Sequence, residues 1–148
     1  MRAGTYSFID VVASLTGPTG TVDLGYDAAA AEEGITIAPM EDKNGMTVGA
    51  DGSVMHSLHA GNAGLITVRL LKTAPGNALL MAYFEAQRAN STLWGKNVIS
   101  VRNKTSGDTV TALFCAFKRV PDLTFAKDGG MNEWSFDCGQ IGRVLGAY

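Results

Sequence analysis

The sequence predicts a mostly β protein, an antiparallel β-sandwich or barrel with one flanking α-helix. Short stretches in which apolar and polar residues alternate recur along the chain, separated by Gly, Pro, Asn and Asp. One stretch, residues 74–90, instead has the spacing of a helix. A chain of 148 residues fits one domain, spanning residues 1–148, and can bury a sizeable core.

The first half of the chain contains several of these alternating stretches. Residues 5–15 (TYSFIDVVASL) predict a strand that ends at the turn TGPTG, and residues 21–25 (TVDLG) can form the return strand. Residues 34–40, 65–71 and 97–103 alternate strictly. Their apolar face carries Ile35, Ile37, Ile66, Val68, Leu70, Ile99 and Val101. Their opposite face carries Thr36, Ala38, Thr67, Arg69, Ser100 and Arg102.

The C-terminal part continues the pattern. Residues 109–117 (TVTALFCAF) follow the turn KTSGD. The alternation places one set of side chains on a shared face: Val110, Ala112, Phe114 and Ala116, against Thr109, Thr111 and Leu113. Residues 123–127 (LTFAK) and 132–141 (NEWSFDCGQI) predict a final pair of strands around the turn DGGM, with Trp134, Phe136 and Cys138 on one face.

The helical segment follows a proline. Asn77 is expected to cap a helix about 12 residues long, because Asn is a favoured N-cap and good helix formers follow it. One stripe of this helix is predicted to face the core: Leu80, Tyr83, Phe84 and Gln87.

Composition excludes several function classes. The formal charge is −2, and the basic residues are scattered, so sequence-independent DNA binding has no electrostatic basis. The longest apolar run, near GNALLMAYFEAQ, is too short to cross a bilayer, and no membrane partner is expected. The first residues, MRAGTYSFID, lack the apolar stretch of a secretory signal.

Catalytic and metal chemistry find little support. His56 and His59 would share a helix face, but the surrounding glycines disfavour a helix, and in a strand the two point to opposite sides. Cys115 and Cys138, 23 positions apart, are most simply two buried thiols, with a disulfide as the alternative. Neither a G-x-S-x-G elbow nor a phosphate loop is present. We expect no enzyme activity, no metal and no cofactor.

Residues 40–64 form a long, glycine-rich insert with a charged start, MEDKNG. Inserts of this length are usually functional or become ordered on binding. An exposed sheet edge is in addition a template for pairing with another chain. The insert therefore indicates contact with a partner, although a hairpin without a role is the alternative.

Several segments resemble a family of tail tube proteins from contractile-tailed phages. They are GTYSFIDV, AEEGITI, EDKN.MTVGADGSVMHSLHAG, TVRLLKTAPGNALL and GGMNEW.FDCGQI, in order from Gly4 to Gly146. The resemblance implies a tail-tube-like β-sandwich or barrel with a flanking helix. It also implies hexameric rings whose inner sheets join edge to edge and stack into a hollow tube that conducts DNA to the host. Secretion-system and pyocin tube proteins are relatives.

The resemblance also implies partners and a location. The chain would contact copies of itself, the tail sheath outside, the tape measure protein and passing DNA inside, and the baseplate and tail terminator at the ends. It would belong to the virion tail, after assembly in the host cytoplasm. A monomeric β-barrel that binds a small ligand is the main alternative, and an enzyme of unrecognised type is a more distant one.

Two sets of residues follow as candidate contacts. The insert, about residues 40–64, is expected to be an extended stacking hairpin that turns at Asp51–Gly52. Its expected contact residues are Glu41, Asp42, Lys43, Asn44, Asp51, His56 and His59. The expected lumen-facing residues are Thr36, Thr67, Arg69, Ser100, Arg102, Thr109 and Thr111. Because arginine attracts phosphate, acids are expected to offset Arg69 and Arg102, with candidates Glu33, Glu41, Asp42 and Asp108.

Overall fold

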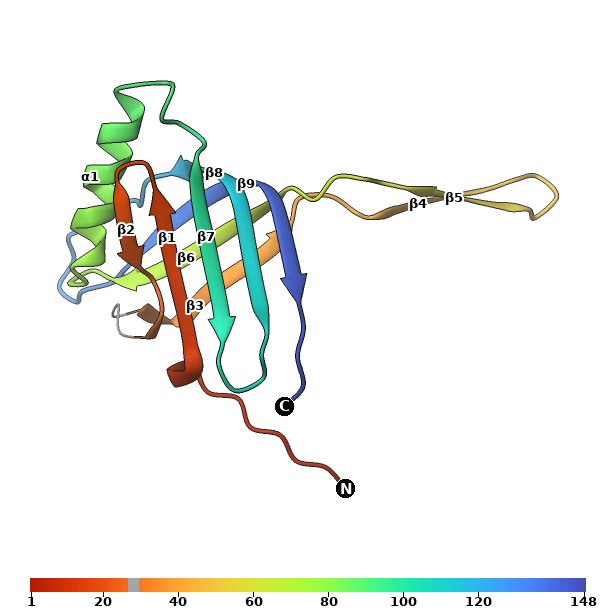
Figure 1. The fold of residues 1–148 in the computed structure, drawn as a ribbon, viewed down its shortest axis with the longest axis horizontal. Coiled ribbons are helices and arrows are strands. Elements are labelled where there is room, and N and C mark those ends of the chain that lie inside the picture. Colours follow the sequence, from red (N-terminus) through yellow and green to blue (C-terminus); the bar gives the residue numbers. More distant parts are fainter. Residues whose placement is uncertain (27–29) are drawn as a thin grey trace.

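The computed structural model describes residues 1–26 and 30–148, and of residues 30–33 the backbone alone. The strands are β1 (Val11–Gly17), β2 (Gly20–Asp23), β3 (Ala30–Pro39), β4 (Asn44–Val48), β5 (Val54–Leu58), β6 (Gly64–Leu71), β7 (Asn97–Asn103), β8 (Thr109–Arg119) and β9 (Met131–Val144). One α-helix, α1 (Gly76–Arg88), lies between β6 and β7, and a single 3₁₀ turn, Phe8–Asp10, precedes β1. The prediction of a mostly β fold with one helix is confirmed (Figure 1).

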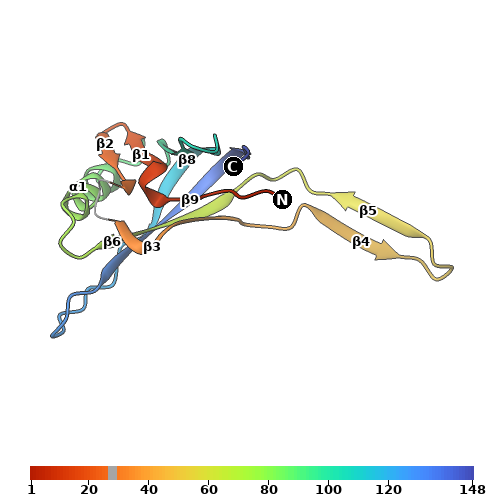
Figure 2. The ribbon, with the colours of Figure 1, turned by 90° about the horizontal axis from the view of Figure 1, so that it is seen from below.

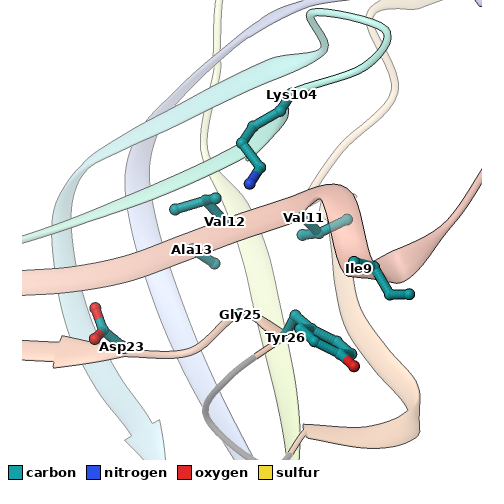
Figure 3. Close-up of a pocket in the computed structure, with 8 residues that line it drawn as sticks. All are labelled: Ile9, Val11, Val12, Ala13, Asp23, Gly25, Tyr26 and Lys104. Atoms are coloured by element: carbon teal, nitrogen blue, oxygen red, sulfur yellow. The ribbon is translucent and has the colours of Figure 1, made fainter.

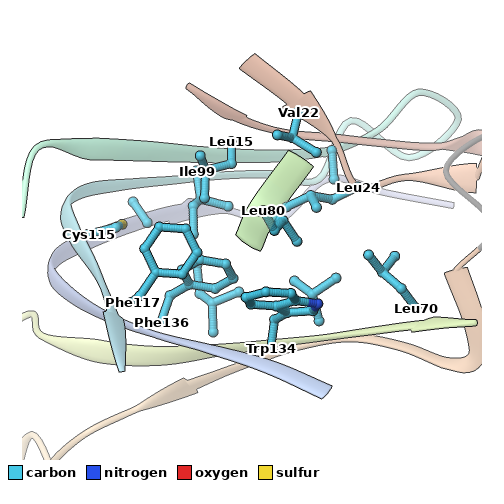
Figure 4. Packing of buried hydrophobic residues seen from close by; sticks show 14 of the residues in the cluster. Leu15, Val22, Leu24, Leu70, Leu80, Ile99, Cys115, Phe117, Trp134 and Phe136 are labelled. Carbon is cyan, nitrogen blue, oxygen red and sulfur yellow. The ribbon is translucent and has the colours of Figure 1, made fainter. Parts of the chain in front are cut away.

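Seven strands form one antiparallel sheet in the order β2-β1-β7-β8-β9-β6-β3, and β4 and β5 form a separate two-stranded sheet. The sheet bends over itself, so that β1, β2 and β7 lie over β3, β6 and β9 (Figures 1 and 2). The core fills the space between these two layers. Leu15 and Ile99 enter it from one layer, and Trp134 and Phe136 enter it from the other (Figure 4).

The strict alternation in β6 has the predicted outcome. Ile66, Val68 and Leu70 are fully buried, and the backbone of this strand pairs with β3 on one side and β9 on the other. In a strand paired on both sides, the alternation of apolar and polar residues determines which side chains face the core. The sequence pattern was therefore sufficient to predict the buried residues of β6.

The first predicted strand begins later than expected. Residues 5–10 are not in β1, which starts at Val11. The hydroxyl oxygen of Ser7 accepts a hydrogen bond from the backbone N–H of Ile9, 3.2 Å away, and so caps the 3₁₀ turn that precedes the strand. The local side-chain cap competes with the extended conformation, which is why the alternation TYSFID was misleading.

The face assignment in β8 is correct only as far as Ala112. Phe114 and Ala116 were predicted to share a face with Ala112, which is buried, but the buried residues beyond it are Cys115 and Phe117. Phe114 has a φ of 55° and is 66% exposed. The pairing between β7 and β8 shifts at this point, so a β-bulge inserts one extra residue and reverses the alternation.

Residues 123–127 are not a strand, so the predicted pairing with the NEWSFDCGQI segment is wrong. β9 pairs with β8 and β6 instead. Residues 120–130 form a loop, in which Leu123 and Phe125 are exposed and the Lys72 ammonium lies 4.0 Å from the Phe125 ring centre. Alternating apolar and polar residues form a strand only where a neighbouring strand hydrogen-bonds to their backbone.

The helix starts at Gly76, after Pro75, rather than after Asn77. The Asn77 side chain donates to the carbonyl oxygen of Leu71 at 2.9 Å and accepts from Trp134 Nε1 at 2.9 Å. It therefore ties the helix start to β9 instead of capping it. The predicted stripe is confirmed, because Leu80 and Gln87 are buried and Tyr83 and Phe84 pack against the core. Among the described residues no helix has the length and apolarity needed to cross a membrane.

Candidate assembly surfaces

The two border strands of the sheet differ in how they are covered. β2 has four residues, and α1 lies beside it (Figure 1). The Tyr83 hydroxyl donates to the Thr21 carbonyl oxygen of β2 at 3.4 Å. β3 has ten residues, and within the described parts of the chain nothing pairs with its outer side. A long uncovered border strand is a template for another chain, whereas a short covered one is not.

The hydrogen-bonding groups on the β3 border can be assigned. Met40 N–H donates to the Ala63 carbonyl oxygen at 3.1 Å, which makes these opposite residues a hydrogen-bonded pair with β6 as the neighbour. In an antiparallel ladder such pairs alternate with non-hydrogen-bonded pairs, whose backbone N–H and C=O groups point away from the neighbouring strand. The backbone N–H and C=O of Ile35 and Ile37 therefore point away from β6, toward the uncovered side.

A second unpaired stretch lies on β8. Its pairing with β7 ends at Asn97↔Cys115, whereas its pairing with β9 continues to Arg119. Residues 116–119 of β8 therefore have a strand neighbour on one side only, within the described residues. The sequence alone did not indicate this stretch, because its pattern does not show where β7 ends.

Residues 40–63 leave the body as a long hairpin built from β4 and β5 (Figures 1 and 2). Its tip is the predicted one. Gly52 has a φ of 87°, a conformation that favours glycine, and its N–H donates to the Gly49 carbonyl at 3.1 Å. The Asp51 carboxylate accepts from the Ser53 N–H at 2.9 Å, and this backbone hydrogen bond lowers the pKa of Asp51.

Hydrogen bonds within the hairpin hold its base. His59 Nδ1 donates to the Asp42 carbonyl oxygen at 2.8 Å, and the His59 N–H donates to the Lys43 carbonyl at 2.9 Å. The Asn44 amide donates to His56 Nδ1 at 3.3 Å. The histidines thus brace the hairpin from within, and their predicted role in contacts to another subunit stays a prediction.

One face of the hairpin is apolar and exposed. Opposite residues share a face, and every second residue along a strand shares it too. This face carries Met46, Val48, Val54 and Leu58, together with Asn44 and His56. Val48 is 58% exposed and Leu58 is 87% exposed. A two-stranded hairpin on its own is at best marginally stable in water, so covering this face would stabilise it. The apolar alternation across the Asp-Gly turn was the signal that could have revealed this face from sequence.

The seven predicted lumen residues fall into two groups on opposite outer faces. One group lies on the layer of β3 and β6: Thr36, Thr67 and Arg69. The other lies on β7 and the start of β8: Ser100, Arg102, Thr109 and Thr111. These layers sandwich the core, so their outer faces point away from each other (Figure 4). A single channel can therefore be lined by one group and not by both.

Arg69 has an acidic neighbour, although none of the four candidates. Arg69 Nε lies 3.4 Å from a Glu133 carboxylate oxygen on β9, and an Arg69 Nη1–H donates to Thr36 Oγ1 at 3.1 Å. Among the candidates, Asp108 accepts from the Gly146 N–H at 2.6 Å, near the C-terminus. Glu41 and Asp42 lie at the base of the hairpin, and the side chain of Glu33 is outside the described residues.

The hollows of the body differ in volume. A shallow one on the outer surface, of about 460 Å³, is lined by Phe84, Trp94 and Phe117 among others. Another lies against β1, lined by Ile9, Val12, Asp23, Tyr26 and Lys104 among others, with a volume of about 170 Å³ (Figure 3). Ligand pockets usually have about 300–1,000 Å³. A third hollow, of about 290 Å³, is lined by Tyr6, Phe8 and Tyr148 near the two termini and by residues of β3 and β7. Side chains fill the interior between the layers, so the hollow of ligand size lies outside the core and not inside a closed barrel.

Metal ligation has no support in the described residues. They contain no group of three or more His, Cys, Asp or Glu side chains placed to hold a metal ion. His56 and His59 each bond within the hairpin, as described above. The chemistry available at these surfaces is therefore main-chain pairing and apolar contact.

An open sheet border, a projecting apolar hairpin and a filled core are features typical of a protein that assembles with other polypeptides. The sequence profile of the bacteriophage PhiTE tail tube protein family matches residues 3–146, so the chain belongs to that family. This confirms the resemblance seen in the sequence, and membership of a family of structural tube proteins agrees with the prediction that the chain is not an enzyme. Among curated proteins no sequence match is found.

Solved structures with the same fold include chains of an extracellular contractile injection system and of the anti-feeding prophage. The sheath/tube terminator of an extracellular contractile injection system (PVC, extended state) has a TM-score of 0.64 at 12% identity, covering 97% of this chain and 99% of that one. The anti-feeding prophage cap has a TM-score of 0.60 at 12% identity, covering 98% and 95%. A chain of the PVC sheath-tube complex has a TM-score of 0.59 at 11% identity, covering 91% and 88%. At these identities the similarity establishes the fold.

Proposed function

We propose that six copies of this protein join their sheets into a ring, and that rings stack into the hollow tail tube of a contractile phage tail, through which DNA passes to the host. The observation that carries the proposal is the long, uncovered β3 border, which contrasts with the short β2 border beside α1. Family membership supports the tube, and the structural neighbours support a contractile machine.

Ring closure is proposed to join β3 of one copy to residues 116–119 of β8 in the next. Both stretches have a strand neighbour on one side only, within the described residues. They belong to strands at opposite ends of the run β3-β6-β9-β8, so identical copies can continue this run from one to the next. A closed ring leaves neither of these two stretches exposed, which removes the aggregation hazard of β3.

The outer face of β3, β6 and β9 is proposed to line the lumen. Among the described elements α1 lies at one end of the two layers, beside β2, and not on this outer face (Figure 2). Of the predicted lumen residues this choice retains Thr36, Thr67 and Arg69. Glu133 offsets the charge of Arg69, so the arginine is a weaker attractor for passing phosphates than a free one would be.

The hairpin is proposed to mediate stacking between rings. It projects well beyond the body, and its exposed apolar face lacks a partner within the described chain. A head-to-tail contact of this kind does not close on itself and therefore propagates as a filament. The tail sheath would lie outside, the tape measure protein inside, and the baseplate and terminator at the two ends, with assembly in the host cytoplasm.

Electron microscopy of the purified protein at high concentration tests the proposal. We expect rings or tubes with six-fold symmetry. A matched pair of variants probes the β3 border: Ile37→Pro removes an outward N–H, while Ile37→Val keeps it and trims one methyl group. The valine variant should assemble and the proline variant should stay monomeric while folded. Monomers of the unmodified protein at every concentration, with a small molecule bound, would instead favour the ligand-binding barrel.

A further inference from the structure

Two cysteines face each other in the middle of the sheet. Cys115 of β8 and Cys138 of β9 are direct partners in the antiparallel register, and both are buried. Their Sγ atoms lie 2.9 Å apart. The tube assembly proposed above makes no use of this pair.

The strand geometry already suits a bond between them. Directly opposite residues of an antiparallel pair have Cα atoms about 4.5 or 5.5 Å apart, depending on the type of pair. Both values lie within the range of about 4.4–6.8 Å that disulfides span. Both side chains also point to the same face, the core, so the two sulfur atoms can bond without any change of the backbone pairing.

We propose that Cys115 and Cys138 are an oxidation site, a dithiol that a small peroxide converts into an intramolecular disulfide between β8 and β9. Burial excludes bulky oxidants, whereas hydrogen peroxide is about as small as the water that enters by local opening. The site stands independently of tube formation. Its use, a covalent link that forms once a particle has left the reducing host cytoplasm, rests on the proposed function.

The chemistry balances with one peroxide per pair. The Cys115 thiolate attacks one oxygen of hydrogen peroxide, the O–O bond breaks, and the leaving hydroxide takes up the proton released by the thiol. The resulting sulfenic acid (S–OH) on Cys115 is attacked by the sulfur of Cys138. An S–S bond forms, and the hydroxide and the Cys138 proton leave as a second water. Two thiols are oxidised by two electrons and one peroxide is reduced to two waters.

The surroundings favour Cys115 as the attacking sulfur. The hydrogen bond shared with Cys138 lowers the pKa of Cys115, since the remaining thiol can donate to the thiolate. The same hydrogen bond, burial and the nearby negative charges of Cys115 and Asp137 raise the pKa of Cys138. A thiolate is the reactive form of cysteine, so the first step is expected at Cys115.

Intact-mass spectrometry of the full-length folded protein tests the proposal. Reduced protein is treated with hydrogen peroxide, the remaining thiols are blocked under denaturing conditions, and the products are digested without reduction. We expect a product two hydrogens lighter, unreactive toward the thiol blocker, and one linked peptide containing both cysteines. Closing this loop should also raise the Tm by about 6–12 °C relative to the reduced protein.

Two variants keep the test decisive. Cys138→Ala should stop at the sulfenic acid on Cys115, which dimedone labels once the protein is denatured, and Cys115→Ala should give less label, at Cys138. Should either variant fail to fold, the comparison of reduced and oxidised unmodified protein is sufficient. Two free thiols after oxidation, or disulfides only between molecules, would overturn the proposal. A tube that forms normally in those cases would leave the proposed function intact.

Discussion

The body and the hairpin use similar side chains for opposite purposes. In the body the apolar residues that face the space between the layers are buried, and Phe136, Ile66 and Leu15 have no exposed surface. In the hairpin four apolar residues of β4 and β5 share one face and remain more than half exposed: Met46, Val48, Val54 and Leu58. The body thus folds around its own core, whereas the hairpin presents a core-like face for which the described chain has no counterpart.

This contrast assigns separate energetic roles to the two regions. Burying a large apolar side chain contributes about 1.5–3 kcal/mol, and in the body this contribution belongs to the folding of one chain. In the hairpin the same contribution becomes available only when another molecule covers the face. Substitutions in the body should therefore change the free energy of unfolding, and substitutions on the hairpin should change assembly. The four predictions below test that separation, from the largest effect on unfolding to the smallest.

Truncating Phe136 should cause the largest loss of stability. Its ring is fully buried and lies 5.0 Å, centre to centre, from the ring of Phe117. Phe136→Ala is expected to lower the free energy of unfolding by about 3–5 kcal/mol, because it removes apolar contact and leaves a cavity. Urea denaturation followed by fluorescence measures this change. Ser135→Ala, on the opposite face of β9, is the control and should change it by less than about 0.5 kcal/mol. Equal losses in both variants would refute the two-layer core.

The buried amide pair between α1 and β7 should come next. Gln87 Nε2 donates to Asn97 Oδ1 at 2.9 Å, and Asn97 Nδ2 donates to Gln87 Oε1 at 2.8 Å. Gln87→Ala leaves Asn97 partly unpaired in the core and is expected to cost about 1–3 kcal/mol. A double-mutant cycle with Asn97→Ala checks this by denaturation. The double variant should cost less than the sum of the two single ones, and strict additivity would argue against the pairing.

These two sites show how far the sequence could predict the body. The helical spacing of Leu80 and Gln87 identified the buried stripe, because a helix needs no distant partner to define its faces. The amide partner of Gln87 was not predictable, since it depends on where α1 docks against β7. The bulge at Phe114 also escaped prediction, because a positive φ in a bulky residue is set by the surrounding sheet and not by local preference. The uncovered β3 border and the Arg69–Glu133 pair depend on strand order, which alternation does not specify.

Charging the apolar face of the hairpin should separate folding from assembly. Val48→Asp with Leu58→Asp is expected to change the free energy of unfolding by less than about 0.5 kcal/mol, because both side chains are already in water. Sedimentation and electron microscopy should nevertheless show no tubes, since stacking would bury two unpaired carboxylates. Thr47→Asp, on the other face of β4, is the matched control and should interfere less. A double variant that still forms long tubes would remove the hairpin from the stacking contact.

The smallest effect should come from the tip of the hairpin. The Asp51 carboxylate accepts a hydrogen bond from the Ser53 N–H, which lowers its pKa below the ordinary value of 3.8. A carboxyl group whose pKa is lower in the folded state stabilises that state at pH values above its unfolded-state pKa. This stabilisation is lost as the pH falls through the folded-state pKa. The tip should therefore stay ordered at neutral pH and loosen only in acid below pH 3.8, with no change in global unfolding. An NMR titration of the Asp51 carboxyl carbon measures its midpoint, and Asp51→Asn, which keeps an acceptor oxygen, should abolish the pH dependence at Ser53. A midpoint at or above 3.8 would mean that the turn is not closed by this hydrogen bond, and the hairpin would then lack the rigid tip that distinguishes it from a mobile loop.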